Sequence, residues 1–252
     1  MTLLELTPRV EADDPRTALP VVIIGAGPVG LAAAANLAER GRDFVVIEAG
    51  DRVAASIRLW GHTRLFSPWR HVVDPASRRL LEASGWTMPA DERRSPTGHE
   101  LVDAYLEPLA ALPQIGPRIR FGTRAIAVTR KGMDRTRTAG RARAPFLLRV
   151  RTAEGIVEEL TGRAVIDASG TYATPNPLAS SGLDPLGLAD VPDLVHHALP
   201  DVLGTERASF AGKHTVVVGA GHSASNTLIA LAEVARTEPA TRVTWLIRNA
   251  SA

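Results

Sequence analysis

The chain has 252 residues, of which 45% are hydrophobic and 22% charged. This composition is typical of a globular protein with one large or two modest domains, and it excludes a disordered or fibrous chain. The 29 basic and 27 acidic residues nearly cancel, so the net charge gives no reason to expect a nucleic-acid partner. The absence of cysteine excludes disulfides, thiolate metal ligands, cysteine nucleophiles and a redox-active dithiol within the chain.

An uncharged run of 22 residues covers positions 17–38 near the N-terminus. Glycine and proline interrupt this run, which divides into a β-branched stretch at 21–24 and an Ala/Leu-rich helical stretch. We therefore interpret it as a strand followed by a helix and not as a membrane span. The acidic stretch 11–14 stands where a signal peptide would be basic, so we expect a soluble, cytoplasmic protein that binds no membrane.

A ten-residue pattern occurs twice and organises the sequence. Residues 21–30 read VVIIGAGPVG, and residues 215–224 read TVVVGAGHSA. After each copy, an Ala/Leu-rich helix is followed by a second β-branched strand, at 44–48 and at 243–248. Each copy thus predicts a strand, a tight turn, a helix and a further strand. The expected fold class is α/β, with one Rossmann-like domain followed by the start of a second one.

The region between the two copies predicts one helix and several strands. Residues 97–100 (TGHE) have the pattern of a capping box, which opens a helix over 98–111 that Pro108 should end or kink. Strands are expected at 118–128, at 145–151 and at 164–167.

A basic loop lies between the first two of these strands. Residues 130–143 include six basic residues and one acidic residue, Asp134. The loop is either a nucleic-acid patch or a solvated hairpin tip with glycines at 132 and 140. No aromatic residue is interleaved to stack on bases, which favours the hairpin tip.

The first glycine-rich turn has the full G-x-G-x-x-G spacing between a strand and a helix. Gly25 permits the tight turn, Gly27 lets a diphosphate approach the main chain, and Gly30 allows the helix to pack closely on the strand. The free amide groups and the dipole of the helix N-terminus favour a negative charge there. The expected contacts of the diphosphate are Gly25, Gly27, Pro28, Val29 and Gly30.

Glu48 stands 23 residues after Gly25, at the end of the second strand. A carboxylate at this point accepts hydrogen bonds from the ribose hydroxyl groups of a dinucleotide, and its charge repels a 2'-phosphate. The first turn therefore predicts a dinucleotide without a 2'-phosphate.

The second turn differs from the first in its third glycine and in the charge that follows. Its nucleotide-binding residues are expected to be Gly219, Gly221, His222, Ser223 and Ala224. Its second strand ends in Arg248, whose guanidinium suits a 2'-phosphate, so NADPH fits better than NADH; the alternative is that Arg248 is simply solvated.

Residues 221–225 (GHSAS) also nearly match the nucleophile elbow of serine hydrolases. That fold places its acid and its histidine after the serine, and residues 226–252 contain neither Asp nor His. The histidines show no H-E-x-x-H spacing. We therefore expect neither a hydrolase nor a metal site.

The two turns, together with the strand that leads into residues 167–170 (DASG), resemble the flavoproteins with two dinucleotide-binding domains. They resemble the class B flavin monooxygenases most closely and the thioredoxin reductase-like enzymes more distantly. In that family the first turn binds FAD in a three-layer ββα domain, and the second turn binds NADPH. The resemblance extends over residues 21–252. It implies a flexible arm at 1–19, an FAD-binding domain at 20–177, a connecting segment at 178–212 and the N-terminal part of an NADPH-binding domain at 213–252.

Further motifs support this resemblance. Ala168, Ser169 and Gly170 match an A-T-G stretch that passes the flavin in the family, and residues 210–213 (FAGK) match an F-x-G-K element that leads into the NADPH turn. In place of the family's G-G-x-W, residues 54–60 read AASIRLW. The resemblance implies that Ser67 and Trp69, a little further on, lie beside the isoalloxazine ring.

The resemblance implies an FAD-dependent, NADPH-using oxidoreductase, in which hydride passes from NADPH to the flavin and then to oxygen or a small substrate. No catalytic side chain is expected, because the cofactor performs the chemistry. Family members are longer, so we expect an N-terminal part or a truncated form of such an enzyme; a non-catalytic FAD- or NADPH-binding module is the alternative. The expected partners are a small-molecule substrate and either a second copy of the chain or a complementing C-terminal segment.

Overall fold

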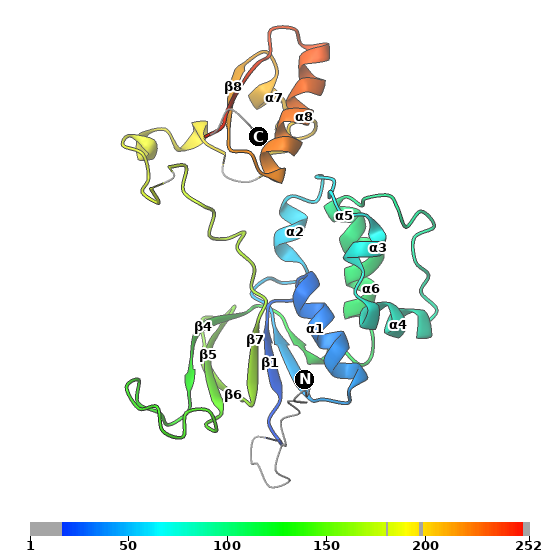
Figure 1. Ribbon diagram of the computed structural model, residues 1–252, viewed down its shortest axis with the longest axis vertical. Coiled ribbons are helices and arrows are strands. Elements are labelled where there is room, and N and C mark those ends of the chain that lie inside the picture. The colour runs from blue at the N-terminus through cyan, green and yellow to red at the C-terminus, as the bar shows by residue number, and fades with distance from the viewer. Residues whose placement is uncertain (1–16, 180, 197–198, 249–252) are drawn as a thin grey trace, which may run out of the picture.

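A four-stranded parallel sheet forms the centre of the larger lobe (Figure 1). The computed structural model describes residues 17–179, 181–196 and 199–248. The strands lie in the order β3 (Ile119–Arg120), β2 (Phe44–Ile47), β1 (Val21–Ile24) and β7 (Ala164–Asp167). Ile24 pairs with Ile47 on one side and with Asp167 on the other. The carboxyl ends of β1, β2 and β7 therefore meet at the same edge of the sheet.

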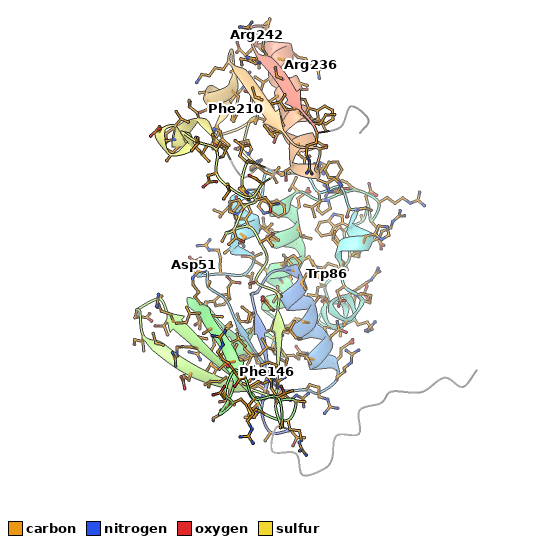
Figure 2. All side chains as sticks on the ribbon, turned by 60° about the vertical axis from the view of Figure 1, so that its left-hand side comes forward. Asp51, Trp86, Phe146, Phe210, Arg236 and Arg242 are labelled. Carbon is orange, nitrogen blue, oxygen red and sulfur yellow. The ribbon has the colours of Figure 1, made fainter. Side chains whose placement is uncertain are left out.

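An antiparallel three-stranded layer covers one face of this sheet. It consists of β4 (Thr123–Arg130), β5 (Phe146–Thr152) and β6 (Val157–Gly162), in that order. Leu148 and Val150 of β5 pack against Val22 and Ile47 of the parallel sheet in a buried cluster. The basic loop joins β4 to β5, so it is a hairpin tip; its first residue, Arg130, still belongs to β4 and stacks its guanidinium on the ring of Phe146, which Figure 2 labels in this layer.

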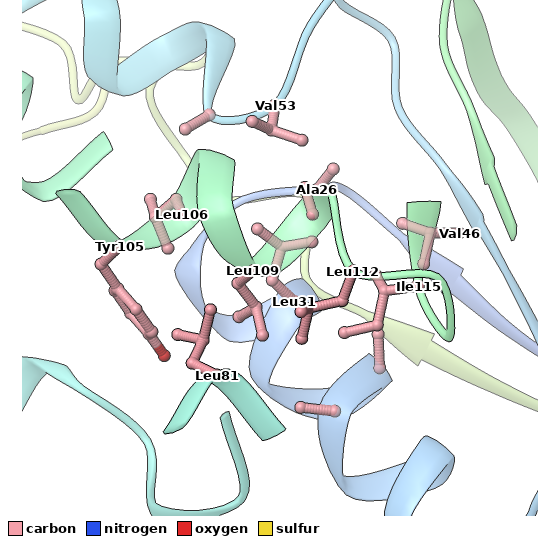
Figure 3. Packing of buried hydrophobic residues seen from close by; sticks show 14 of the residues in the cluster. Ala26, Leu31, Val46, Val53, Leu81, Tyr105, Leu106, Leu109, Leu112 and Ile115 are labelled. Carbon is pink, nitrogen blue, oxygen red and sulfur yellow. The ribbon is translucent and has the colours of Figure 1, made fainter. Parts of the chain in front are cut away.

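Helices cover the opposite face of the parallel sheet. They are α1 (Pro28–Glu39), α4 (Pro75–Ala83), α5 (Gly98–Leu101) and α6 (Glu107–Ala110), with the shorter α2 (Ala55–Leu59) and α3 (Trp69–Val72) nearby. Figure 3 shows Leu31 of α1 and Leu109 of α6 meeting above the sheet, next to Leu112 and Ile115. All four of these side chains are buried. The arrangement is the three-layer ββα form of a Rossmann-like domain, and it confirms the predicted fold class.

The helix predicted over 98–111 begins with the expected capping box, in which Thr97 and Glu100 exchange side-chain and backbone hydrogen bonds. It is not regular, because a π-helical turn, η1 (Val102–Leu106), separates α5 from α6. Pro108 lacks an N–H group and therefore cannot bond the carbonyl four residues earlier. That carbonyl, of Ala104, accepts a hydrogen bond of 2.7 Å from the indole Nε1 of Trp86.

Two strand predictions differ from the structure. The single strand expected at 118–128 is divided between β3 and β4, because Gly122 turns the chain with φ +59° and sends the two parts into different sheets. Strand β6 was not predicted, because Val157–Gly162 contains two glutamates and lacks a clear alternation of apolar residues.

The smaller lobe contains the second copy of the repeat. Strands β8 (His214–Val218) and β9 (Arg242–Leu246) pair in parallel and are covered on one face by α8 (His222–Thr237). The short helix α7 (Arg207–Phe210) precedes them, and Phe210 is buried with Val217 and Leu231 (Figure 2). The segment that connects the lobes contains the 3-10 turns η3 (Leu188–Asp190) and η4 (Pro192–Leu194). Another 3-10 turn, η2 (Gly116–Arg118), lies in the larger lobe directly before β3.

The predicted N-terminal arm lies outside the described residues up to position 16, and so do residues 249–252 of the predicted second domain. In the described part of the chain, none of the helices has the length and apolar character that crossing a membrane requires.

Replacing Trp86 by Phe should lower the free energy of unfolding by about 1 kcal/mol or more, because the Ala104 carbonyl loses its donor. Chemical denaturation measures this loss. The matched experiment repeats the change in a Pro108→Ala background, where residue 108 regains an N–H group and the loss should be smaller. Equal losses in the two backgrounds would contradict the link between Trp86 and Pro108.

Candidate nucleotide-binding site

The first glycine-rich turn passes very close to the backbone that follows β7. Gly25 has φ +100°, and a Cβ atom there would lie 2.5 Å from the carbonyl oxygen of Ala168. A Cβ atom on Gly30 would collide with the carbonyl oxygen of Gly25. Gly27 is different: apart from its own atoms and those of its two chain neighbours, no heavy atom of the described residues lies within 4 Å of the position of its Cβ. The first and third glycines therefore serve packing, whereas the second leaves an open approach to the main chain.

The N-terminus of α1 begins at this open approach. Gly27 is the N-cap residue, and among the described residues no side chain caps the helix. Pro28 at the first position has no N–H group to satisfy, and Val29 is 68% exposed. The amide groups of the first turn and the helix dipole are thus available to an anion. This arrangement fits the diphosphate of a dinucleotide.

Glu48, which directly follows strand β2, is hydrogen-bonded to the turn between β1 and α1. Its Oε2 accepts a hydrogen bond of 2.7 Å from the backbone amide of Ala26, and its Oε1 accepts one of 2.8 Å from the amide of Gly50. One carboxylate thus ties the β1–α1 turn to the loop that follows β2. Glu48 also lines the adjacent cavity, where its remaining lone pairs can accept hydrogen bonds from hydroxyl groups.

A cavity of about 550 Å³ lies at this edge of the sheet. Its predicted members are Gly25, Gly27, Pro28, Val29, Glu48, Ala168, Ser169 and Gly170. The structure thus brings together residues from three parts of the sequence, and Gly30 lies buried directly beneath them. At the β7 end, hydrogen bonds from Ser169 to the Asp167 carboxylate lower the pKa of that group and hold the turn in place.

The cavity also has walls that were not among the predicted site residues. Thr123, Arg124 and Ala125 of β4 line one side, and Trp60 and Leu65 line another. The sequence around β4 contains no motif that distinguishes these residues from those of an ordinary strand. Trp60 ends the stretch 54–60, which differs from the family's G-G-x-W pattern but keeps its tryptophan. That tryptophan was the only sign in the sequence that this stretch lines the cavity.

Ser67 and Trp69 are not among the residues that line this cavity, and their position beside the isoalloxazine ring stays a prediction. Trp69 is 1% exposed and packs in the core beneath the helices, because it starts the short helix α3 with its indole turned inward. Ser67 is exposed on the loop before that helix.

The second glycine-rich turn has the same backbone form as the first. Gly219 has φ +111°, Gly221 is the N-cap residue of α8, and no heavy atom of the described residues lies within 4 Å of a Cβ placed on either. His222, Ser223 and Ala224 form the first turn of this helix. The imidazole of His222 stacks on the ring of Phe66 from the larger lobe, with ring centroids 4.5 Å apart.

Arg248 lies two residues after the end of β9 and is exposed. Because Val218 pairs with Leu246, the end of β9 lies beside the second turn. The indole Nε1 of Trp245 donates a hydrogen bond of 2.7 Å to the Gly219 carbonyl, which joins β9 to that turn.

Comparison with known proteins finds similar sequences among flavin-dependent enzymes. Residues 22–138 match the family model described as pyridine nucleotide-disulphide oxidoreductase. Flavin-containing monooxygenase FMO GS-OX-like 2 of Arabidopsis thaliana is 29% identical over 193 residues, which cover 68% of this chain and 40% of that protein. Indole-3-pyruvate monooxygenase YUCCA6 of Arabidopsis thaliana is 31% identical over 203 residues, which cover 80% of this chain and 42% of that protein. The chain spans about two fifths of the length of these curated relatives.

Solved structures of flavoproteins have the same fold. The bacillithiol disulfide reductase Bdr of Bacillus cereus matches with a TM-score of 0.58 and 20% identity, over 90% of this chain and 57% of that one. A mutant flavin monooxygenase of Stenotrophomonas maltophilia matches with a TM-score of 0.55 and 23% identity, over 93% and 58% of the two chains. The chain therefore has the fold of the two-dinucleotide-binding-domain flavoproteins, as the resemblance predicted. Its sequence relatives within that class include flavin monooxygenases.

Replacing Gly27 by Ala should weaken FAD binding at least about tenfold while changing the free energy of unfolding by less than about 0.5 kcal/mol. The reason is that the methyl group enters space which is open in the protein but is needed by a diphosphate. FAD titration and chemical denaturation measure the two quantities. Gly30→Ala is the control, because its methyl group meets the Gly25 carbonyl and should destabilise the fold itself. Unchanged FAD affinity in Gly27→Ala would contradict the assignment of the turn.

Proposed function

We propose that this chain is an FAD-dependent, NADPH-using oxidoreductase of the flavin monooxygenase type, acting on a small-molecule substrate. The observation that carries this proposal is the common edge of β1, β2 and β7, where the open Gly27, the Glu48 carboxylate and residues 168–170 line one cavity. The relatives named as flavin-containing and indole-3-pyruvate monooxygenases support the same assignment. A cytoplasmic location remains a prediction.

The residues of the chain would bind and orient the two cofactors. The N-terminus of α1 would bind the diphosphate of FAD, and Glu48 would accept hydrogen bonds from its ribose. The second turn and Arg248 would bind NADPH, with the guanidinium on the 2'-phosphate. Bound FAD would supply the redox chemistry, accepting hydride from NADPH and passing electrons to oxygen or a substrate. A dithiol mechanism would need cysteine, which the sequence lacks.

A second candidate is a nucleotide-binding module without turnover. It is favoured by the small size of the second lobe, in which α8 covers only one face of a two-stranded sheet. On the other face Val216, Val218 and Leu246 are each about half exposed. Parallel sheets normally bury both faces, so this face suits a complementing segment or a second copy of the chain.

Purification followed by a visible absorption spectrum distinguishes the two candidates. The oxidoreductase should take up FAD, show the flavin band and lose that band when NADPH is added without oxygen. A module should bind FAD and keep the band unchanged in the presence of NADPH. A protein that fails to take up FAD would contradict both candidates.

Replacing Arg248 by Ala should weaken NADPH binding about tenfold and leave NADH binding unchanged, because only NADPH has a phosphate for the guanidinium. Calorimetric titration with each nucleotide measures the effect. Arg242→Ala is the matched control, since Arg242 is an exposed arginine at the opposite end of β9 (Figure 2). Equal losses for NADPH and NADH in Arg248→Ala would remove the case for phosphate recognition.

A further inference from the structure

The positive charge of the chain is concentrated in the basic loop between β4 and β5. Residues 130–143 contain six of the 29 basic residues and one of the 27 acidic residues, so the formal charge of the loop is +5. The remaining 23 basic and 26 acidic residues give the rest of the chain a formal charge of −3. The nearly neutral total therefore conceals a strongly cationic hairpin tip.

The cations of this loop are free to meet a partner. Four of its basic side chains are exposed: Lys131, Arg135, Arg137 and Arg143. None of the six basic side chains forms an ion pair with a described residue. The one acidic side chain is already engaged, because Asp134 accepts hydrogen bonds of 2.8 Å from both the amide and the hydroxyl group of Thr136.

Part of the segment that connects the two lobes has the opposite charge. This acidic segment, residues 181–194, contains three aspartates and neither lysine nor arginine. The aspartates are Asp184, Asp190 and Asp193. All three are exposed, and within the described ranges none of them has an ion-pair partner.

Both regions also expose apolar side chains. In the acidic segment, Leu183 is 73% exposed, Leu194 is 78% exposed and Leu186 is fully exposed. Next to the basic loop, Ile126 and Val128 are 39% and 45% exposed on β4, which is the edge strand of its sheet. Large apolar side chains that are exposed together commonly mark a protein–protein contact. Each region thus combines apolar surface with charge of a single sign.

The two regions lie toward opposite ends of one molecule. In Figure 1 the green loop that joins β4 to β5 is near the lower end, and the yellow segment that contains η3 and η4 is near the upper end, both on the left-hand side. No hydrogen bond or ion pair between described residues joins them. Two copies related by a two-fold axis can bring the basic loop of each to the acidic segment of the other, so that the contact forms twice.

We propose that a second copy of the chain is the partner of both regions, in a symmetric dimer in which the basic loop of each copy binds the acidic segment of the other. Complementary charge gives the contact its specificity and its register. One exposed ion pair contributes little, but here several charges act together with the burial of exposed leucines. A nucleic acid would use only the basic loop and would leave the acidic segment uncovered. The proposal does not depend on the proposed cofactors.

Analytical ultracentrifugation of the full chain at two salt concentrations tests the dimer. At micromolar protein and about 50 mM NaCl the chain should sediment as a dimer. At about 500 mM NaCl dimerisation should be at least about tenfold weaker, because salt screens exposed charges. A chain that is monomeric at low salt would overturn the proposal, and so would a monomer that binds a short DNA duplex instead of a second copy.

Two charge-reversed variants test the contact itself. One carries Arg135→Glu and Arg137→Glu, and the other carries Asp190→Lys and Asp193→Lys. Each should dimerise at least about tenfold more weakly than the wild type at low salt, because like charges then face each other. An equimolar mixture of the two variants should dimerise again, because both contacts between unlike copies then pair opposite charges. Weakening without recovery in the mixture would overturn the proposal.

A third variant is the matched control for net charge. It carries Arg42→Glu and Arg93→Glu, two exposed arginines outside both regions, so its net charge changes by the same amount as that of the loop variant. It should dimerise as the wild type does. Equal weakening in this control and in the loop variant would show that net charge alone decides the association, which would overturn the assignment of the basic loop.

Discussion

The cavity at the edge of the parallel sheet depends on the close approach between the β1–α1 turn and the backbone that follows β7. Parallel pairing of β2, β1 and β7 in register delivers three chain segments to one edge, and residues without side chains at 25 and 30 let them touch. Glu48 then ties the turn to the loop after β2 through two backbone amides. These contacts hold the N-terminus of α1, the Glu48 carboxylate and the exposed main chain at Gly27 next to one another.

The two lobes differ in how completely their sheets are covered: the sheet of the larger lobe is covered on both faces, and that of the smaller lobe on one face. The larger lobe buries a continuous core between α1, α6 and the parallel sheet, and a second cluster under the antiparallel layer. The smaller lobe repeats the turn chemistry on a two-stranded sheet with one covered face. The lobes contact each other through the loop 62–66, where Phe66 stacks on His222 and the Arg64 carbonyl accepts a hydrogen bond from Asn226 of α8.

Local rules predicted the features that depend on neighbouring residues. The capping box at 97–100 follows from hydrogen bonds within one turn of chain, and the structure confirms it. The glycine spacing likewise requires only the geometry of one turn. Pro108 does not end the helix, because α6 continues through it to Ala110; the irregularity near it is the π-helical turn η1 that precedes it. The same rules missed β6, because the adjacent Glu158 and Glu159 break the apolar alternation and the strand is stabilised by its pairing with β5 rather than by its own sequence pattern. They merged β3 with β4, because the turn at Gly122 sends the two parts into different sheets. The burial of Trp69 was not predictable from its own segment either, because it is decided by how α3 packs.

The sequence by itself therefore determined the fold class, the two glycine-rich turns and the places of Gly25, Gly27 and Glu48 in the first βαβ unit, since backbone conformation and strand order within such a short unit are local properties. Only the tertiary structure decided which distant segments complete the site. It brought Thr123, Trp60 and residues 168–170 to one cavity. These contacts arise from the packing of layers and lobes, which depends on the summed burial of many side chains and not on the pattern of any one segment.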